Sequence, residues 1–172
     1  MSQNPVGEVT ALLTDLSSCP YEISGGKMVV CDQQECCRMS VLLIFKMYVI
    51  AVITGQVRLR KKAFANPEDA LRHGGVQYHR EDPYVERCRR AHQNDMENIF
   101  PFFFLGAIYS LTEPTLSVAR LHFLVFFLCR IVHSVAYLCQ LKAPTRSVAY
   151  VIGQVPCLSM LLQILFAVAS HW

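Results

Sequence analysis

Long apolar segments separated by short polar ones dominate the pattern of this chain from about Met39 onward. The clearest is Ser147–Ser170, a run of twenty-four residues without Asp, Glu, Lys or Arg, which predicts a transmembrane helix. Met39–Val57 is a second apolar segment, and its nineteen residues just suffice to span a bilayer. Lys46 stands in the middle of that segment, so we expect it to face the inside of a helix bundle or to have a buried partner.

Two further helices are predicted between these segments. The apolar segment Ile99–Leu111 has only thirteen residues, so a spanning helix must take its missing turns from the polar stretch Glu86–Asn98 that precedes it. Leu116–Leu141 is long enough to span, although it carries Arg130 and His133. The pattern therefore predicts an all-α membrane protein with a bundle of four transmembrane helices.

Residues 1–38 differ from the rest, because they mix Pro and Gly with acidic side chains and contain no long apolar run. We expect them to form a divergent, flexible N-terminal segment, and residues 39–172 to form the membrane domain. Only 17% of the chain is charged and 53% is hydrophobic, which is unusual for a soluble protein of this size. The net charge of +3 is too small to indicate nucleic-acid binding, and the eight cysteines show no zinc-site spacing.

The basic residues predict how the helices are oriented. Nine Lys and Arg residues lie from Arg58 to Arg90, around the polar connection Ala63–Pro83. By the positive-inside rule this connection lies on the cytosolic side. With four spans, both ends of the chain then lie on the luminal side, and residues 142–145 form a second cytosolic turn.

Each of the last three helices carries a stripe of polar side chains. In the helix that includes Glu86–Leu111, the stripe is Arg87, Arg90, Asn94 and Glu97. In the helix Leu116–Leu141 it is Arg130, His133 and Tyr137, and in the last helix it is Arg146, Ser147, Tyr150 and Gln154. Spacings of three and four residues place the members of a stripe on one face. Ionisable groups at membrane depth usually face the bundle interior or a ligand. Alternatively, the first stripe is a solvated helix start held by intrahelical pairs, and the histidine is a core residue.

The three stripes meet at the cytosolic end of the bundle, where they offer cations, one buried carboxylate, amides and tyrosine hydroxyls. This set suits a small zwitterion with several carboxylates, held by arginines, and an ammonium group, held by Glu97. Arg146 and Ser147 at the start of the last helix would also stabilise a thiolate. A thiol tripeptide such as glutathione fits, and so do other small anions.

The stretch Glu86-Arg87-x-x-Arg90-Ala91-His92-x-Asn94-x-x-Glu97, followed by Pro101-Phe102, resembles the signature of the MAPEG family of membrane glutathione enzymes. The resemblance runs from about Lys46 to Gln163 and includes the long run Ile53–Gly75. It is greatest to those members that use glutathione to isomerise the prostaglandin H endoperoxide to prostaglandin E.

This resemblance implies a homotrimer of four-helix subunits in the endoplasmic reticulum or perinuclear membrane. The active site would face the cytosol, bind glutathione between subunits and take a lipid endoperoxide from the membrane. It implies a catalytic set of Arg146, Asp69 and Ser147, and no metal. The implied glutathione contacts are Arg58, Gln93, Asn94, Glu97, His133, Tyr137, Arg146, Ser147 and Tyr150. Gln93 stands where these isomerases usually have an arginine, so weaker glutathione binding is expected.

Two other functions share some of these features. A general microsomal glutathione transferase and peroxidase would carry the same central motif. A non-catalytic membrane protein that binds glutathione or lipid is the second alternative. Ser147 directly after Arg146, together with the run Ala63–Gly75, favours the isomerase, and the presence of Arg146, Tyr150 and Asp69 argues against the non-catalytic protein.

Overall fold

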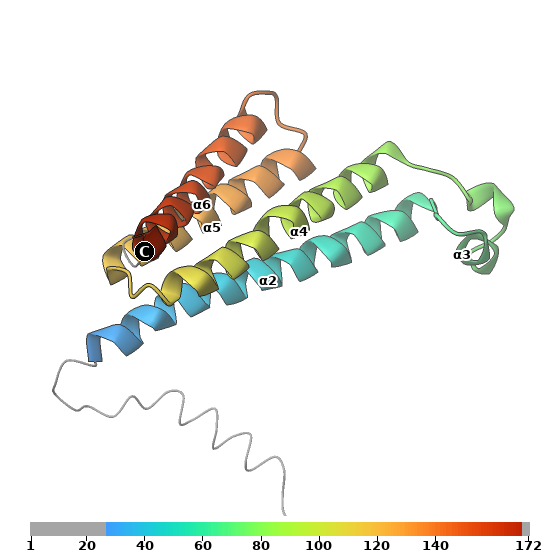
Figure 1. Ribbon diagram of the computed structural model, residues 1–172. Coiled ribbons are helices and arrows are strands. Elements are labelled where there is room, and N and C mark those ends of the chain that lie inside the picture. The colour runs from blue at the N-terminus through green and yellow to red at the C-terminus, as the bar shows by residue number, and fades with distance from the viewer. Residues whose placement is uncertain (1–26, 170–172) are drawn as a thin grey trace, which may run out of the picture. The chain divides into compact units, whose positions relative to one another are not determined.

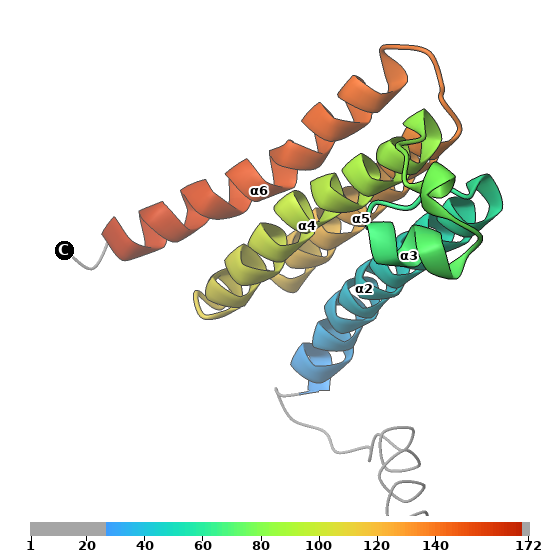
Figure 2. The ribbon, with the colours of Figure 1, turned by 90° about the vertical axis from the view of Figure 1, so that its right-hand side faces the viewer.

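The computed structural model describes residues 27–169, with side chains from Cys36 onward, and every long element in this part is a helix (Figure 1). The elements are α2 (Lys27–Lys61), α3 (Pro67–Arg72), the 3-10 helix η1 (Val76–Tyr78), α4 (Pro83–Ser110), α5 (Leu116–Leu138) and α6 (Thr145–Ala169). The chain divides into two units after Cys31, and apart from the first residues of α2 these elements all belong to the second unit. Figures 1 and 2 both show α4 lying between α2 and α6.

Three of the described helices are long and apolar enough to cross a membrane: Cys36–Lys61 within α2, Leu116–Leu138 and Thr145–Ala169. The predicted spans in α2, α5 and α6 are therefore confirmed by length and composition. α4 has 28 residues, but its first half is the polar stretch noted above, so its composition does not qualify it. The fourth span stays a prediction.

Two helix ends differ from the sequence prediction. α2 begins at Lys27 rather than at Met39, so part of the segment expected to be flexible is helical; residues 1–26 lie outside the described part of the chain. The boundary of the membrane domain at residue 39 stays a prediction. α5 ends at Leu138 rather than at Leu141, because Gln140 adopts a left-handed backbone conformation with φ of 56° that cannot continue a helix.

The connection between α2 and α4 is held by local contacts. Asp82 caps α4, because its carboxylate accepts hydrogen bonds from the backbone N–H groups of Tyr84 (2.9 Å) and Val85 (3.2 Å). Within the connection the rings of Phe64 and His73 stack with centroids 4.5 Å apart. These contacts give the connection a defined conformation, including the short helix α3 that carries Asp69.

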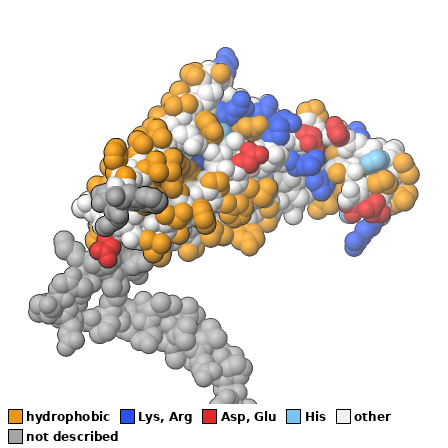
Figure 3. Space-filling model, viewed as in Figure 1, with side chains coloured by type: hydrophobic (Ala, Val, Ile, Leu, Met, Phe, Trp, Pro, Cys, Tyr) orange, Lys and Arg blue, Asp and Glu red, His pale blue; other side chains and the backbone are white. Residues whose placement is uncertain are grey.

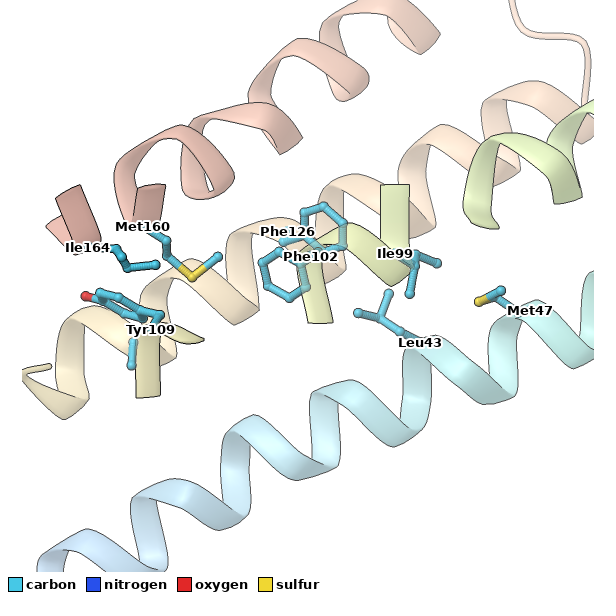
Figure 4. Close-up of a cluster of buried hydrophobic side chains, with 9 residues drawn as sticks. Leu43, Met47, Ile99, Phe102, Tyr109, Phe126, Met160 and Ile164 are labelled. Atoms are coloured by element: carbon cyan, nitrogen blue, oxygen red, sulfur yellow. The ribbon is translucent and has the colours of Figure 1, made fainter. Parts of the chain in front are cut away.

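The core is a cluster of buried apolar side chains from all four long helices (Figure 4). Its members are Leu43, Met47, Ile99, Phe102, Tyr109, Ala119, Phe126, Met160 and Ile164. At its centre the rings of Phe102 and Phe126 stack with centroids 3.7 Å apart. α5 and α6 pack closely, and a Cβ atom added at Gly153 would lie 3.3 Å from the Cβ of Cys129.

Two polar contacts tie α6 to α4. Gln154 Nε2 donates to Asn98 Oδ1 over 2.8 Å, and Tyr109 Oη donates to Gln163 Oε1 over 2.6 Å. Between membrane helices each such bond contributes about 1 kcal/mol. They fix the register of α6, and hence the position of its first turn relative to α4.

Large apolar side chains cover much of the outer surface of the long helices, for example Phe45, Phe104 and Phe166. Figure 3 shows this apolar surface over the helices, with charged side chains gathered toward the end of the unit that carries α3. An apolar exterior with charges at one end suits a protein whose helices face lipid.

Candidate functional site

A buried ionic cluster joins α2, α4 and α5. The carboxylate of Asp95 is fully buried, and its Oδ1 lies 2.7 Å from Lys46 Nζ and 2.5 Å from Arg130 Nη2. Ser134 Oγ adds a hydrogen bond of 3.3 Å to Asp95 Oδ2. The expectation that Lys46 has a buried partner is confirmed, and that partner is Asp95.

The cluster continues toward the predicted site residues through Arg130. The same Nη2 that contacts Asp95 also donates to Asn94 Oδ1 over 2.8 Å. His133, one turn further along α5, is also buried, and its ring centroid lies 5.8 Å from that of Tyr137 and 6.4 Å from that of Tyr150.

Two arginines lie against the ring of Tyr137. The guanidinium carbon of Arg146 is 4.7 Å from the ring centroid, and that of Arg87 is 5.8 Å from it, both within cation–π range. A pocket of about 220 Å³ opens beside them. It is lined by Arg87, Gln140, Leu141, Ala143, Arg146 and Ser147. Sites for small molecules usually measure about 300–1,000 Å³, so this pocket offers room for one anionic part of a tripeptide rather than for all of it.

The remaining predicted residues lie on other surfaces of the chain. Gln93 and Glu97 are exposed on α4, where Gln93 Nε2 donates to Glu97 Oε1 over 3.0 Å. Within the single chain the fully buried carboxylate of α4 is that of Asp95. The rotation of α4 turns the Asp95 face inward and the Glu97 face outward, and the role of Glu97 as a ligand contact stays a prediction.

Arg58 and Asp69 also lie apart from Arg146. Arg58 lines a separate cavity of about 360 Å³ beneath the α2–α4 connection, with Asp82 and Glu86 among its walls. Its Nε is buried and has no hydrogen-bond partner in the described part of the chain. Asp69 lies in the first turn of α3, where Asn66 Nδ2 donates to its Oδ2 over 3.3 Å.

Comparison with known proteins places the chain. The model of the MAPEG family matches residues 39–166. The chain belongs to the MAPEG family. Among its MAPEG relatives, prostaglandin E synthase of Bos taurus is 69% identical and that of Equus caballus 67% identical, each over 132 residues that cover 77% of this chain and 86% of the relative. Microsomal glutathione S-transferase 1 of Bos taurus is 46% identical over 128 residues, covering 72% of this chain and 83% of the relative.

Asp95 is the residue that the sequence analysis of this MAPEG chain missed. A usable signal was present, because the residues four and seven positions before and after Asp95 are all apolar. They are Cys88, Ala91, Ile99 and Phe102, and all four are buried. A carboxylate in the middle of an apolar stripe on a membrane helix requires a buried cation. Lys46 was expected to have such a partner or to face the inside of the bundle.

Proposed function

We propose that this MAPEG protein is a glutathione-dependent isomerase that converts the prostaglandin H endoperoxide to prostaglandin E in the endoplasmic reticulum or perinuclear membrane. The observation that carries the proposal is that Arg146 and Ser147, at the start of α6, line one pocket with Arg87, and that both arginines lie against the ring of Tyr137. The names of the relatives above support the same reaction.

The residues present fit glutathione, which carries two carboxylates, one ammonium group and one thiol. Arg87 and Arg146 supply cations beside a small pocket, and Arg58 has a buried N–H group with no hydrogen-bond partner among the described residues. Arg58, Gln93, Asn94, Glu97, His133, Tyr137 and Tyr150 are the residues that would hold it with Arg146 and Ser147. When bound, glutathione would supply the thiol, and in its ionised form the nucleophile, for the peroxide group of the substrate.

The protein's own contribution is to make that thiolate available. A free thiol has a pKa of about 8.5, so only a few per cent of it is ionised at neutral pH. The guanidinium of Arg146, the hydroxyl of Ser147 and the positive end of the α6 dipole all favour the ionised form. Asp69 is the proposed base for the ring proton.

We also propose that the protein is a homotrimer with glutathione bound between subunits. Glu97 and Gln93 are exposed on α4, and Arg58 and Asp69 lie on other surfaces than Arg146. Residues that would hold one ligand are thus divided among separate faces of a single chain, and neighbouring copies would bring those faces together. The basic α2–α4 connection supports a site that faces the cytosol.

The second candidate is a general glutathione transferase and peroxidase, which the 46% identity to microsomal glutathione S-transferase 1 favours. One assay separates the candidates: purified protein with glutathione receives either the endoperoxide or a chlorinated aromatic acceptor, and the products are identified. The proposal predicts prostaglandin E. A glutathione conjugate without prostaglandin E would support the transferase, and glutathione binding without either product would support a non-catalytic protein.

A further inference from the structure

We propose that Asp95 is a positioning residue, which acts through Arg130 to fix the side-chain amide of Asn94 as a hydrogen-bond donor to glutathione. The inference rests on the proposed function, because it concerns how this chain would hold that ligand. It concerns a residue outside the set that the sequence analysis named.

The first step is that the place of Arg130 is determined by Asp95. Both side chains are almost completely buried, with exposures of 0% for Asp95 and 2% for Arg130. A buried carboxylate is strongly destabilising unless it is paired and hydrogen-bonded. Asp95 meets this requirement through Lys46 on α2, Arg130 on α5 and the hydroxyl of Ser134, so moving Arg130 away would leave it with less compensation.

The second step is that Arg130 determines the orientation of Asn94. A guanidinium has only donors, so its 2.8 Å contact must involve the amide oxygen of Asn94 and not the amide nitrogen. The oxygen is therefore directed toward the buried cluster. Asn94 itself is only half-buried, and within the described part of the chain its two Nδ2–H donors remain available to an acceptor outside the cluster.

The fixed orientation of Asn94 decides which groups of the ligand it can bind. An asparagine whose orientation is not fixed can offer either its oxygen or its nitrogen, so it discriminates poorly between acceptors and donors. Asn94 with its oxygen directed into the buried cluster presents its N–H donors to a ligand outside it. It therefore suits a carboxylate or a peptide carbonyl of glutathione and disfavours the ammonium group.

A matched pair of variants tests this chain of contacts. Lys46→Met and Arg130→Met each remove one buried cation and leave Asp95 paired with the other, so the formal charge of the cluster changes equally. Only Arg130→Met removes the donor to Asn94. Glutathione binding to the purified full-length proteins is measured by calorimetry, and the KM for glutathione and kcat are measured separately.

The expected result is that Arg130→Met weakens glutathione binding by about fivefold, the effect of one hydrogen bond, with a raised KM and little change in kcat at saturation. Lys46→Met leaves the contact between Arg130 and Asn94 in place. It should therefore change the affinity for glutathione by less than about twofold, the usual deviation for a site that does not contact the ligand. If both variants bound glutathione equally weakly, the proposal would be overturned, because the effect would then come from the lost positive charge and not from the contact to Asn94. Unchanged binding in both would assign the cluster a purely structural role.

Asn94→Asp provides a second test should Arg130→Met fail to fold. Its carboxylate keeps an oxygen for Arg130 but has no N–H donors, so glutathione binding should weaken while the cluster stays paired. Wild-type affinity in Asn94→Asp would overturn the positioning role. Absence of glutathione binding by the wild-type protein would instead refute the proposed function, and with it this inference.

Discussion

At the level of single residues, Arg146 is the side chain on which the proposed chemistry depends most. It is exposed in the first turn of α6, with its guanidinium beside the ring of Tyr137. Arg146→Leu should lower the isomerisation rate roughly ten-fold or more while it weakens glutathione binding much less, because the thiolate loses its cation. The measurements are turnover per folded protein and the thiolate absorbance of bound glutathione.

Lys142→Leu is the control for Arg146→Leu, because Lys142 is an exposed cation in the connection just before α6 and has no proposed role in the site. It should leave both turnover and the thiolate signal unchanged. If Arg146 instead only anchors the chain at the membrane interface, Arg146→Leu would reduce stability and spare the turnover of the surviving protein. Normal turnover with a normal thiolate signal would rule out the proposed role.

Gln93 is the position at which this chain departs from the family pattern. It is exposed and donates to Glu97 over 3.0 Å. Gln93→Arg would place a cation there that can pair with a carboxylate, so the KM for glutathione should fall by up to roughly ten-fold. Gln93→Met, which removes the hydrogen bond without adding charge, should not lower it. A KM unaffected by Gln93→Arg would mean that another cation already holds the carboxylate.

The buried partner of Lys46 could be predicted from the sequence only in part. The need of Lys46 for a partner could be predicted, because an isolated cation at membrane depth is costly. Which carboxylate of α4 meets that need depends on the rotation of the helix about its axis, and Asp95 and Glu97 differ by about 200°. The polar stripe directed attention to Glu97, whereas packing of the opposite, apolar stripe sets the rotation.

At the level of helices, local residue types account for two helix starts, whereas the start of α2 and the end of α5 differ from the predicted bounds. α4 begins at Pro83 after the Asp82 cap, and α3 begins at Pro67 after Asn66, as residues of these types indicate. α2 extends back to Lys27 because the segment between Lys27 and Met39 contains no Pro or Gly to end it. The early end of α5 depends on the conformation of Gln140, a residue type with no strong preference for it.

The close packing of α5 on α6 leads to a prediction at this scale. Because an added Cβ at Gly153 would lie 3.3 Å from Cys129 Cβ, Gly153→Leu should force the helices apart. Overpacking of this kind costs about 1–3 kcal/mol, and the thermal midpoint in detergent should fall accordingly. Val155→Leu is the control, since Val155 is exposed on the same helix. An equal midpoint for the two variants would mean that the α5–α6 contact tolerates a larger side chain.

At the level of the whole molecule, the proposed assembly of several copies has to be tested by experiment. Arg58 and Arg146 line different pockets of the chain, and in the proposed trimer a neighbouring copy would bring the two residues together. Co-expression of Arg58→Ala with Arg146→Leu tests this arrangement. If each site combines the two residues from different copies, about a quarter of the sites in random mixed trimers keep both, so activity should return partly. Each variant expressed alone should be nearly inactive, and inactivity of the mixture would place both residues of a site in one chain.

The orientation of the molecule in the membrane can be tested with two of its own cysteines. Tyr84 Oη donates to the carbonyl oxygen of Leu138 over 3.3 Å, which ties the start of α4 to the end of α5. Exposed Cys139 therefore lies at the same membrane side as the basic α2–α4 connection, and the positive-inside rule assigns that side to the cytosol. Cys37 is exposed near the opposite end of the membrane-spanning part of α2.

In variants that retain only one of these two cysteines, a membrane-impermeant maleimide added to sealed microsomes should label Cys139 and spare Cys37. Permeabilisation should make Cys37 reactive as well, which controls for its accessibility. Because Arg146 and Ser147 follow Cys139 closely in the chain, this labelling also locates the proposed site. Labelling of Cys37 alone in sealed microsomes would mean that the orientation is the opposite one. The proposed site would then lie on the luminal side, contrary to the positive-inside rule.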